Sequence, residues 1–185
     1  MATADDDLPD EAVSWLTTLA LSAAEREQAR AAVLEILLTP GVSAPATLVE
    51  ALLKLYPTDE DKRQGRGALN VLPNPSRRLR ADRFLQLNPT AVEKEHARGQ
   101  LLDLLCNKQH SWASRMLVQD LILLDPLLEE KRAARQALLK LVPDSATSAG
   151  GLVDALLDLN PTTEEKRQAC VSILRLLAVE ADGGR

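Results

Sequence analysis

Aromatic residues are scarce in this chain, which has two tryptophans, one tyrosine and one phenylalanine among 185 residues. Its hydrophobic content is nevertheless 45%, and most of it is leucine, alanine and valine. Strands usually draw on aromatic and β-branched side chains, whereas leucine and alanine are typical of packed helices. The composition therefore predicts an all-α protein with enough apolar surface for a core.

Cysteine is rarer still, and the two that occur, Cys106 and Cys170, lie in separate helical patterns. Two such residues make no disulfide framework, and a reducing compartment is the simpler interpretation. Residues 1–10 hold four aspartates and no apolar run, which is unlike a signal peptide. No stretch approaches the roughly 20 apolar residues that span a bilayer. We therefore expect a soluble, cytoplasmic protein.

Basic charge is outweighed as well, with 22 Lys and Arg against 27 Asp and Glu, a net charge of −5. The pI near 5.1 argues against general nucleic-acid binding, which usually appears as a basic domain. The sequence also offers no glycine-rich phosphate loop, paired catalytic carboxylates or zinc-ligand quartet. We expect neither an enzyme nor a bound cofactor or metal.

What the chain does contain is a repeated corner of the form Leu-x-Pro. An acidic group, a Lys, a small residue and an Arg or its substitute follow each corner, and Leu19 to Leu38 fits the same frame without the proline. A period of roughly 35 residues predicts about five stacked two-helix units, an α-solenoid. The corners are Leu55-Tyr56-Pro57, Leu87-Asn88-Pro89, Leu124-Asp125-Pro126 and Leu159-Asn160-Pro161.

The repeat pattern predicts one helical-repeat domain over residues 10–178. A disordered acidic segment, 1–9, is expected before it and a flexible tail, 179–185, after it. The predicted repeats cover residues 10–40, 46–73, 76–107, 112–143 and 149–178.

Each unit divides into a short helix, a proline stop and a longer helix that opens with a capping box. The residue before proline is pushed out of helical geometry. A hydroxyl then caps the longer helix, and a carboxylate three residues on completes the box. The fourth unit has Leu127 at the cap, so its cap is predicted to be weaker. The predicted boxes are Ser22/Glu25, Thr58/Asp61, Thr90/Glu93 and Thr162/Glu165.

Apolar residues follow a helical spacing in each longer helix, and the first position of every stripe is small. That residue lets a neighbouring helix approach closely. These positions are Ala29, Gly65, Ala97, Ala134 and Ala169.

With these features the chain resembles the HEAT and armadillo-like class of helical repeats, over about residues 10–178. It looks closest to leucine-rich helical repeats of bacterial signalling and defence proteins. The resemblance is one of architecture, because the Leu-x-Pro-Thr-x-Glu-x-Lys pattern is not the consensus of either family. It implies a scaffold or sensor module and carries over no catalytic residue.

Basic residues recur at fixed places in the longer helices. One interpretation is a stripe that grips an acidic partner. The interpretation we favour is that long side chains pack their stems and reach acids or helix-end carbonyls in the adjacent unit. The first row is Arg26, Lys62, Lys94, Lys131 and Lys166, and four residues later come Arg30, Arg66, Arg98, Arg135 and Cys170.

The junction of the second and third repeats breaks the pattern and concentrates positive charge. Gly65 and Gly67 weaken the helix, and Pro73 and Pro75 end it. Arginine clusters bind carboxylates or phosphates, although a solvated loop with ordinary salt bridges would look the same. The predicted partner-binding residues are Arg77, Arg78, Arg80 and Arg83 with Lys62, Arg63 and Arg66.

The function this predicts is a non-catalytic protein-interaction module, acting as adaptor, inhibitor or sensor on an acidic or phosphorylated protein surface. The alternative is a nucleic-acid-binding helical-repeat protein that uses the same arginine-rich junction. A small metal-dependent enzyme is a third hypothesis, because Asp103, Cys106 and His110 are spaced to share a helix face.

Two further features bear on partners. Trp112 is expected to fill a gap between repeats, with an interface anchor as the alternative. The last long helix is less charged than the others around Cys170 to Ile173, which makes self-association through the C-terminal repeat a further prediction.

Overall fold

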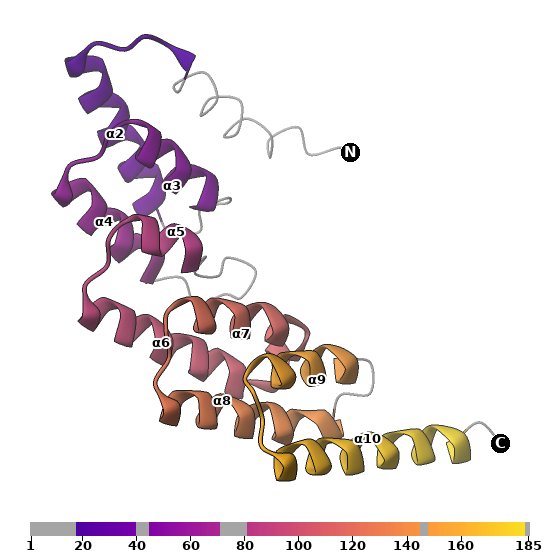
Figure 1. The fold of residues 1–185 in the computed structure, drawn as a ribbon. Coiled ribbons are helices and arrows are strands. Elements are labelled where there is room, and N and C mark those ends of the chain that lie inside the picture. The colour runs from indigo at the N-terminus through magenta and orange to yellow at the C-terminus, as the bar shows by residue number, and fades with distance from the viewer. Residues whose placement is uncertain (1–17, 40–44, 71–80, 145–147, 184–185) are drawn as a thin grey trace, which may run out of the picture. The chain divides into compact units, whose positions relative to one another are not determined.

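The computed structural model describes residues 18–39, 45–70, 81–144 and 148–183, and every regular element in these ranges is a helix (Figure 1). The prediction of an all-α protein is thus confirmed for the described part of the chain. The chain groups into two compact units, residues 1–91 and 92–185. Such grouping is physically reasonable for repeats, because each contacts only its neighbours along the chain.

The first unit contains two longer and two shorter helices. Helix α2 packs against both α3 and α4, and α3 packs against α5. The longer helices thus neighbour each other, and so do the shorter ones. The bounds are α2 Ala23–Leu38, α3 Pro45–Lys54, α4 Asp59–Asn70 and α5 Ala81–Gln86.

The second unit has the same alternation. The shorter helices α7 and α9 lie side by side, and α8 packs against α9 and α10 (Figure 1). Helix α10 continues beyond residue 178, the predicted end of the last repeat, into the segment predicted as a flexible tail. The bounds are α6 Ala91–Cys106, η2 Lys108–Ala113, α7 Ser114–Leu123, α8 Leu128–Leu141, η3 Val142–Asp144, α9 Ala149–Asp158 and α10 Thr163–Gly183.

Capping boxes open α2, α4 and α10 as predicted. In α10, the backbone N–H of Thr162 donates to the Glu165 carboxylate at 2.7 Å, and the Glu165 N–H donates to the Thr162 hydroxyl at 3.2 Å. The boxes of Ser22 with Glu25 and of Thr58 with Asp61 have the same form.

Helix α8 lacks one half of this arrangement, as the leucine at its cap predicted. The Leu127 N–H still donates to Glu130 at 2.6 Å, but the leucine side chain has no oxygen to offer in return.

The core is built from the leucines that precede the corners and from the small residues of the longer helices. Leu55, Leu87, Leu124 and Leu159 are all buried. A methyl group added at Gly65 would lie 3.2 Å from Cδ2 of Leu52 and 3.4 Å from Cδ1 of Leu87. Close helix packing therefore explains why this position of the repeat is always small.

None of the helices described is both long enough and apolar enough to cross a membrane.

Candidate functional site

The residue between Leu and Pro in each corner adopts a left-handed backbone conformation. Its φ angle lies between 52° and 54° at Tyr56, Asn88, Asp125 and Asn160. Its N–H donates to a carbonyl three residues back, at 3.4 Å in the case of Tyr56 and Leu53. This is a common way for a helix to end, with a left-handed residue just past its last turn. The corner thereby turns the chain sharply into the next capping box.

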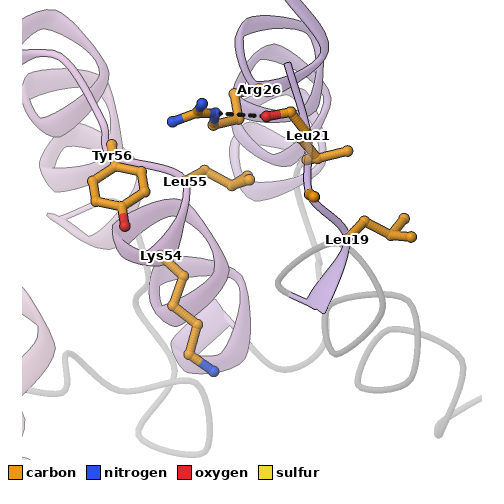
Figure 2. Close-up of a pocket in the computed structure, with 7 residues that line it drawn as sticks. Leu19, Leu21, Arg26, Lys54, Leu55 and Tyr56 are labelled. Carbon is orange, nitrogen blue, oxygen red and sulfur yellow. Dashed lines mark hydrogen bonds between the residues drawn. The ribbon is translucent and has the colours of Figure 1, made fainter. Parts of the chain in front are cut away.

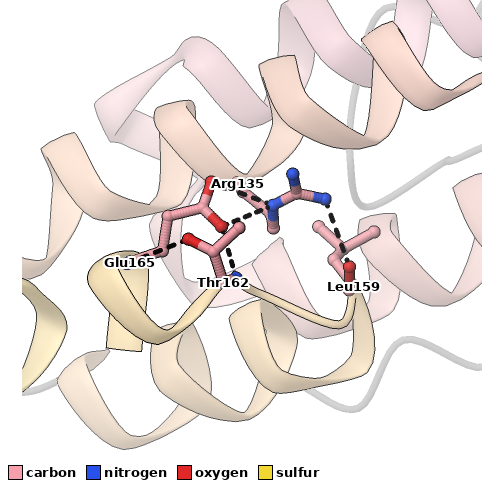
Figure 3. A network of polar contacts seen from close by, with 4 residues as sticks. All are labelled: Arg135, Leu159, Thr162 and Glu165. Atoms are coloured by element: carbon pink, nitrogen blue, oxygen red, sulfur yellow. Dashed lines mark hydrogen bonds and ion pairs between the residues drawn. The ribbon is translucent and has the colours of Figure 1, made fainter. Parts of the chain in front are cut away.

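An arginine from the preceding repeat reaches each corner (Figure 3). Arg135 in α8 donates from Nη1 to the carbonyl oxygen of Leu159 at 3.3 Å and from Nε to both carboxylate oxygens of Glu165 at 3.0 Å. Glu165 at the same time completes the capping box with Thr162. We call this arrangement the clamp: an arginine of one longer helix, the corner leucine carbonyl, and the capping-box acid of the next longer helix.

The clamp recurs with nearly the same geometry. Arg98 donates to the Leu124 carbonyl at 3.4 Å and to Glu130 at 2.8 Å. Arg30 donates to the Leu55 carbonyl at 3.3 Å and to Asp61 at 2.9 Å. The guanidinium of Arg66 is buried and donates to the Leu87 carbonyl at 2.7 Å.

This confirms the favoured interpretation of that row of basic residues, because each of these arginines reaches into the adjacent repeat. Arginine suits the task, because its planar fork satisfies a carboxylate and a carbonyl at once. Because the ion pair is partly buried, removing one partner leaves the other as an uncompensated charge, which strongly destabilises the fold. Around Glu165, burial raises the pKa of the carboxyl, but the hydrogen bonds from Thr162 and Arg135 outweigh it and leave the pKa below its ordinary value.

The fifth repeat departs from the rule, because Cys170 occupies the place of the clamp arginine. Its thiol is exposed. The first position of the stripe, Ala169, is still buried as in the other repeats. Ala169 thus packs into the core as its counterparts do, whereas position 170 has no guanidinium that could donate to a corner carbonyl.

One corner differs from the rest in chemistry. Asn88, Asp125 and Asn160 belong to the types that tolerate a left-handed backbone best, whereas Tyr56 is bulky, and a bulky residue there is an outlier. Its side chain is 75% exposed, so packing against this protein does little to offset the unfavourable backbone. Strain of this kind tends to occur at functional sites.

Tyr56 lies at an open hollow of about 380 Å³ in the first unit (Figure 2). The guanidinium carbon of Arg26 lies 5.7 Å from the centre of the Tyr56 ring, a cation–π distance. Arg26 also donates from Nε to the Leu21 carbonyl at 3.2 Å, which fixes the base of its guanidinium. The half-exposed Lys54 lines the hollow too and lies 3.4 Å from Glu50. An aromatic ring and two cations therefore face one hollow.

The described members of the predicted arginine cluster are held within the protein. Arg63 makes a bidentate contact with Glu60, and the hydrogen bonds from Arg63 and Gln64 lower the pKa of Glu60 to about 2. Arg83 lies 2.9 Å from Glu50 of α3, and Lys62 lies 3.9 Å from Asp59. Arg66 donates to the corner carbonyl of Leu87. Arg77, Arg78 and Arg80 lie outside the described residues.

The structure also places the other candidates. Trp112 lies in η2 with 55% of its surface exposed, so most of the indole does not fill a gap between repeats. The interface alternative stays a prediction. Among the described residues, no three His, Cys, Asp or Glu side chains are placed to hold a metal, so the spacing of Asp103, Cys106 and His110 is not a ligand cluster.

Sequence reasoning did not select the Tyr56 hollow, although one signal for it was present. Tyr56 is the only corner residue that is neither Asn nor Asp. Its contact with Arg26 depends on how α2 lies relative to the Tyr56 corner, which the repeat pattern alone does not give.

Comparison of the chain with protein-family models, curated proteins and solved structures gives no match.

Proposed function

We propose that this chain is a non-catalytic α-solenoid of five two-helix repeats that binds an acidic or phosphorylated segment of another protein. The clamps support the architectural part of the proposal. Each one ties the corner of one repeat to the long helix of its predecessor, as expected for units that stack in one direction. Stacked repeats of this kind present a preformed surface, which lowers the entropic cost of binding.

The observation that carries the binding part is Tyr56. Its exposed ring in a left-handed backbone costs stability, and the protein gains little from it internally. Tyrosine is enriched in binding hot spots because it supplies a large, rigid contact area with a polar end. Arg26 and Lys54 beside it favour a partner that carries carboxylates or phosphates. Arg77, Arg78 and Arg80, which lie outside the described residues, stay a second predicted contact surface.

The test is a quantitative pull-down from nuclease-treated lysate, with the wild-type chain and variants as bait. Tyr56→Asn, which copies the other corners, and Lys54→Glu are expected to lose at least about 10-fold of the specific capture, a typical hot-spot loss. Asn88→Asp, another corner of the same unit, is the matched control and should capture normally. The captured protein should also be released by salt, because its contacts are partly electrostatic.

Equal capture by wild type, Tyr56→Asn and Lys54→Glu would reject the Tyr56 hollow as the binding surface. An arginine-cluster variant, Arg77→Glu with Arg78→Glu and Arg80→Glu, then tests the remaining candidate surface. Salt-dependent binding of a labelled single-stranded oligonucleotide, without any captured protein, would favour the nucleic-acid alternative.

A further inference from the structure

The guanidinium of Arg26 is fixed at its base but leaves its two terminal nitrogens without a partner. Its Nε donates to the Leu21 carbonyl at 3.2 Å, and its central carbon lies 5.7 Å from the centre of the Tyr56 ring (Figure 2). Among the described residues, neither Nη1 nor Nη2 of Arg26 has a hydrogen-bond or ion-pair partner. A planar guanidinium held in this way can offer both terminal nitrogens to one anion.

Three other arginines of the first unit each contact a carboxylate, at 2.6 to 2.9 Å. Arg26 differs from them because no Asp or Glu is among the described residues that line its hollow. An anion that enters the hollow therefore meets no like charge from these lining residues. The three pairs are Arg30 with Asp61, Arg63 with Glu60, and Arg83 with Glu50.

Lys54 supplies a second cation that can leave its present partner at little cost. Its Nζ lies 3.4 Å from Glu50, and 51% of its side chain is exposed. Exposed ion pairs of this kind contribute little to stability. Glu50 also accepts from Arg83 at 2.9 Å, so it keeps a counter-ion when the lysine turns away. The flexible stem then lets the ammonium of Lys54 turn into the hollow that this residue already lines.

The charge of these lining residues favours one kind of anion. Two cations and no acid suit a phosphate monoester, which carries about −1.5 to −2 at pH 7, better than the single charge of an Asp or Glu side chain. Its three acceptor oxygens also suffice for both terminal nitrogens of Arg26 and the ammonium of Lys54. The apolar part of the lining can pack against the stem that carries the phosphate. It consists of Leu19, Ala20, Leu21 and Leu55.

We propose that the Tyr56 hollow is a phosphate-monoester site that receives a phosphorylated side chain of the partner segment, with Arg26 as bidentate donor and Lys54 as second cation. This inference rests on the proposed function, which leaves open whether the partner's anions are carboxylates or phosphates. The hollow of about 380 Å³ has room for one such side chain. The Tyr56 ring lies against the guanidinium of Arg26 and thereby helps to hold it at the hollow.

Two-dimensional NMR of the isotope-labelled full chain, titrated with phenyl phosphate, tests the site directly. Benzenesulfonate is the matched ligand, because it has the same ring and a tetrahedral head but only one negative charge. Phenyl phosphate should bind at least about 10-fold more tightly than benzenesulfonate near pH 7.5, with the largest shifts around Arg26 and Tyr56. Arg26→Lys keeps the charge but loses the fork and should weaken phenyl phosphate binding about 5-fold or more. Arg115→Lys, at an exposed arginine of the second unit, should bind as the wild type does.

The ionisation of the ligand gives a second readout that a folding defect would not reproduce. A phosphate monoester loses its second proton near about pH 6, whereas the sulfonate charge stays constant. The groups that face the ligand are Arg26 of α2, Lys54 of α3 and Tyr56 of the corner, with Glu50 behind Lys54. The affinity for phenyl phosphate should therefore rise about 3- to 10-fold from about pH 5 to 7.5. Equal affinity for the two ligands, or a phenyl phosphate affinity that does not change with pH, overturns the proposal.

Phosphatase treatment of the lysate separates this inference from the proposed function. The capture that depends on Tyr56 should be lost after the treatment and should also be competed by excess phenyl phosphate. Capture that survives phosphatase but is lost in Tyr56→Asn would keep the proposed function and overturn the phosphate assignment. Capture that is equal in wild type and Tyr56→Asn would instead reject the proposed function, and the NMR titration would still decide whether the hollow binds phosphate.

Discussion

The Nε atom of Arg135 lies 3.0 Å from each carboxylate oxygen of Glu165, which is 30 residues further along the chain. This contact joins two local features, because Glu165 also caps its own helix through Thr162. One carboxylate thus stabilises a helix start and the packing of two repeats. The helix cap and the contact between repeats therefore favour the same conformation, as is typical of sequences in which local preferences agree with the overall fold.

Loss of this clamp should destabilise the second unit. We expect Arg135→Ala to lower the free energy of unfolding by about 2 to 3 kcal/mol, because a partly buried carboxylate and a buried carbonyl lose their donor. Urea denaturation followed by circular dichroism measures the change. The control is Arg115→Ala, which removes the exposed contact with Asp154 and should cost less than about 0.5 kcal/mol. Equal losses in the two variants would show that the clamp is no stronger than a surface ion pair.

Acid should weaken the same contact. The folded-state pKa of Glu165 lies below its ordinary value of 4.5, so the stability it contributes is fully present above about pH 4.5 and is lost as the pH falls through the folded pKa. Glu165→Gln should therefore be less stable than wild type at pH 7, and the difference should shrink as the pH falls below 4.5. Urea midpoints measured from pH 7 to pH 3 give this difference directly. A difference that is constant with pH would contradict the assignment.

The two glycines of α4 should respond differently to alanine. Gly67 has no atom within 4 Å of an added methyl group, so Gly67→Ala should stabilise the first unit by about 0.5 to 1 kcal/mol through helix propensity. At Gly65 the added methyl meets Leu52 at 3.2 Å, which offsets the same gain. Thermal unfolding of both variants should show a higher Tm for Gly67→Ala than for Gly65→Ala. The reverse order would mean that α4 packs differently from the structure.

Tyr56→Asn should stabilise the protein, although it removes an aromatic side chain. Asparagine tolerates the left-handed backbone better than tyrosine, and we expect a gain of about 1 kcal/mol. The converse change, Asn160→Tyr, should lose a similar amount. Urea denaturation of both variants tests this expectation. A less stable Tyr56→Asn variant would show that the contact with Arg26 outweighs the backbone strain.

The sequence was informative where the interactions are local. The boxes at Ser22, Thr58 and Thr162 depend on residues three apart, so their spacing in the sequence was enough to predict them. The small residue at Gly65 and its counterparts was predicted from the apolar stripe in the same way. The exit of the chain before each proline was also predicted, although the left-handed conformation of that residue was not.

The candidate site was less predictable because it depends on residues far apart in the sequence. The basic ladder indicated that arginines reach adjacent repeats, but not which atoms they bind. The charge count around Arg83 suggested a partner-binding cluster; in the structure Arg83 is paired with Glu50, and the buried Arg66 donates to the Leu87 carbonyl. The sequence likewise showed that α10 carries fewer charges, but not which of its residues are exposed.

The sequence by itself determined the all-helical class, the repeat register and the start of the longer helices, because each follows from contacts within a few residues. Only the tertiary structure decided the clamps, the pairing of Arg26 with Tyr56 and the exposure of Leu174 in α10. These features depend on which helices pack side by side. The burial of the leucines between the helices sets how far apart the helices lie. Hydrogen bonds between repeats form only after that packing has brought their donors and acceptors within about 3 Å.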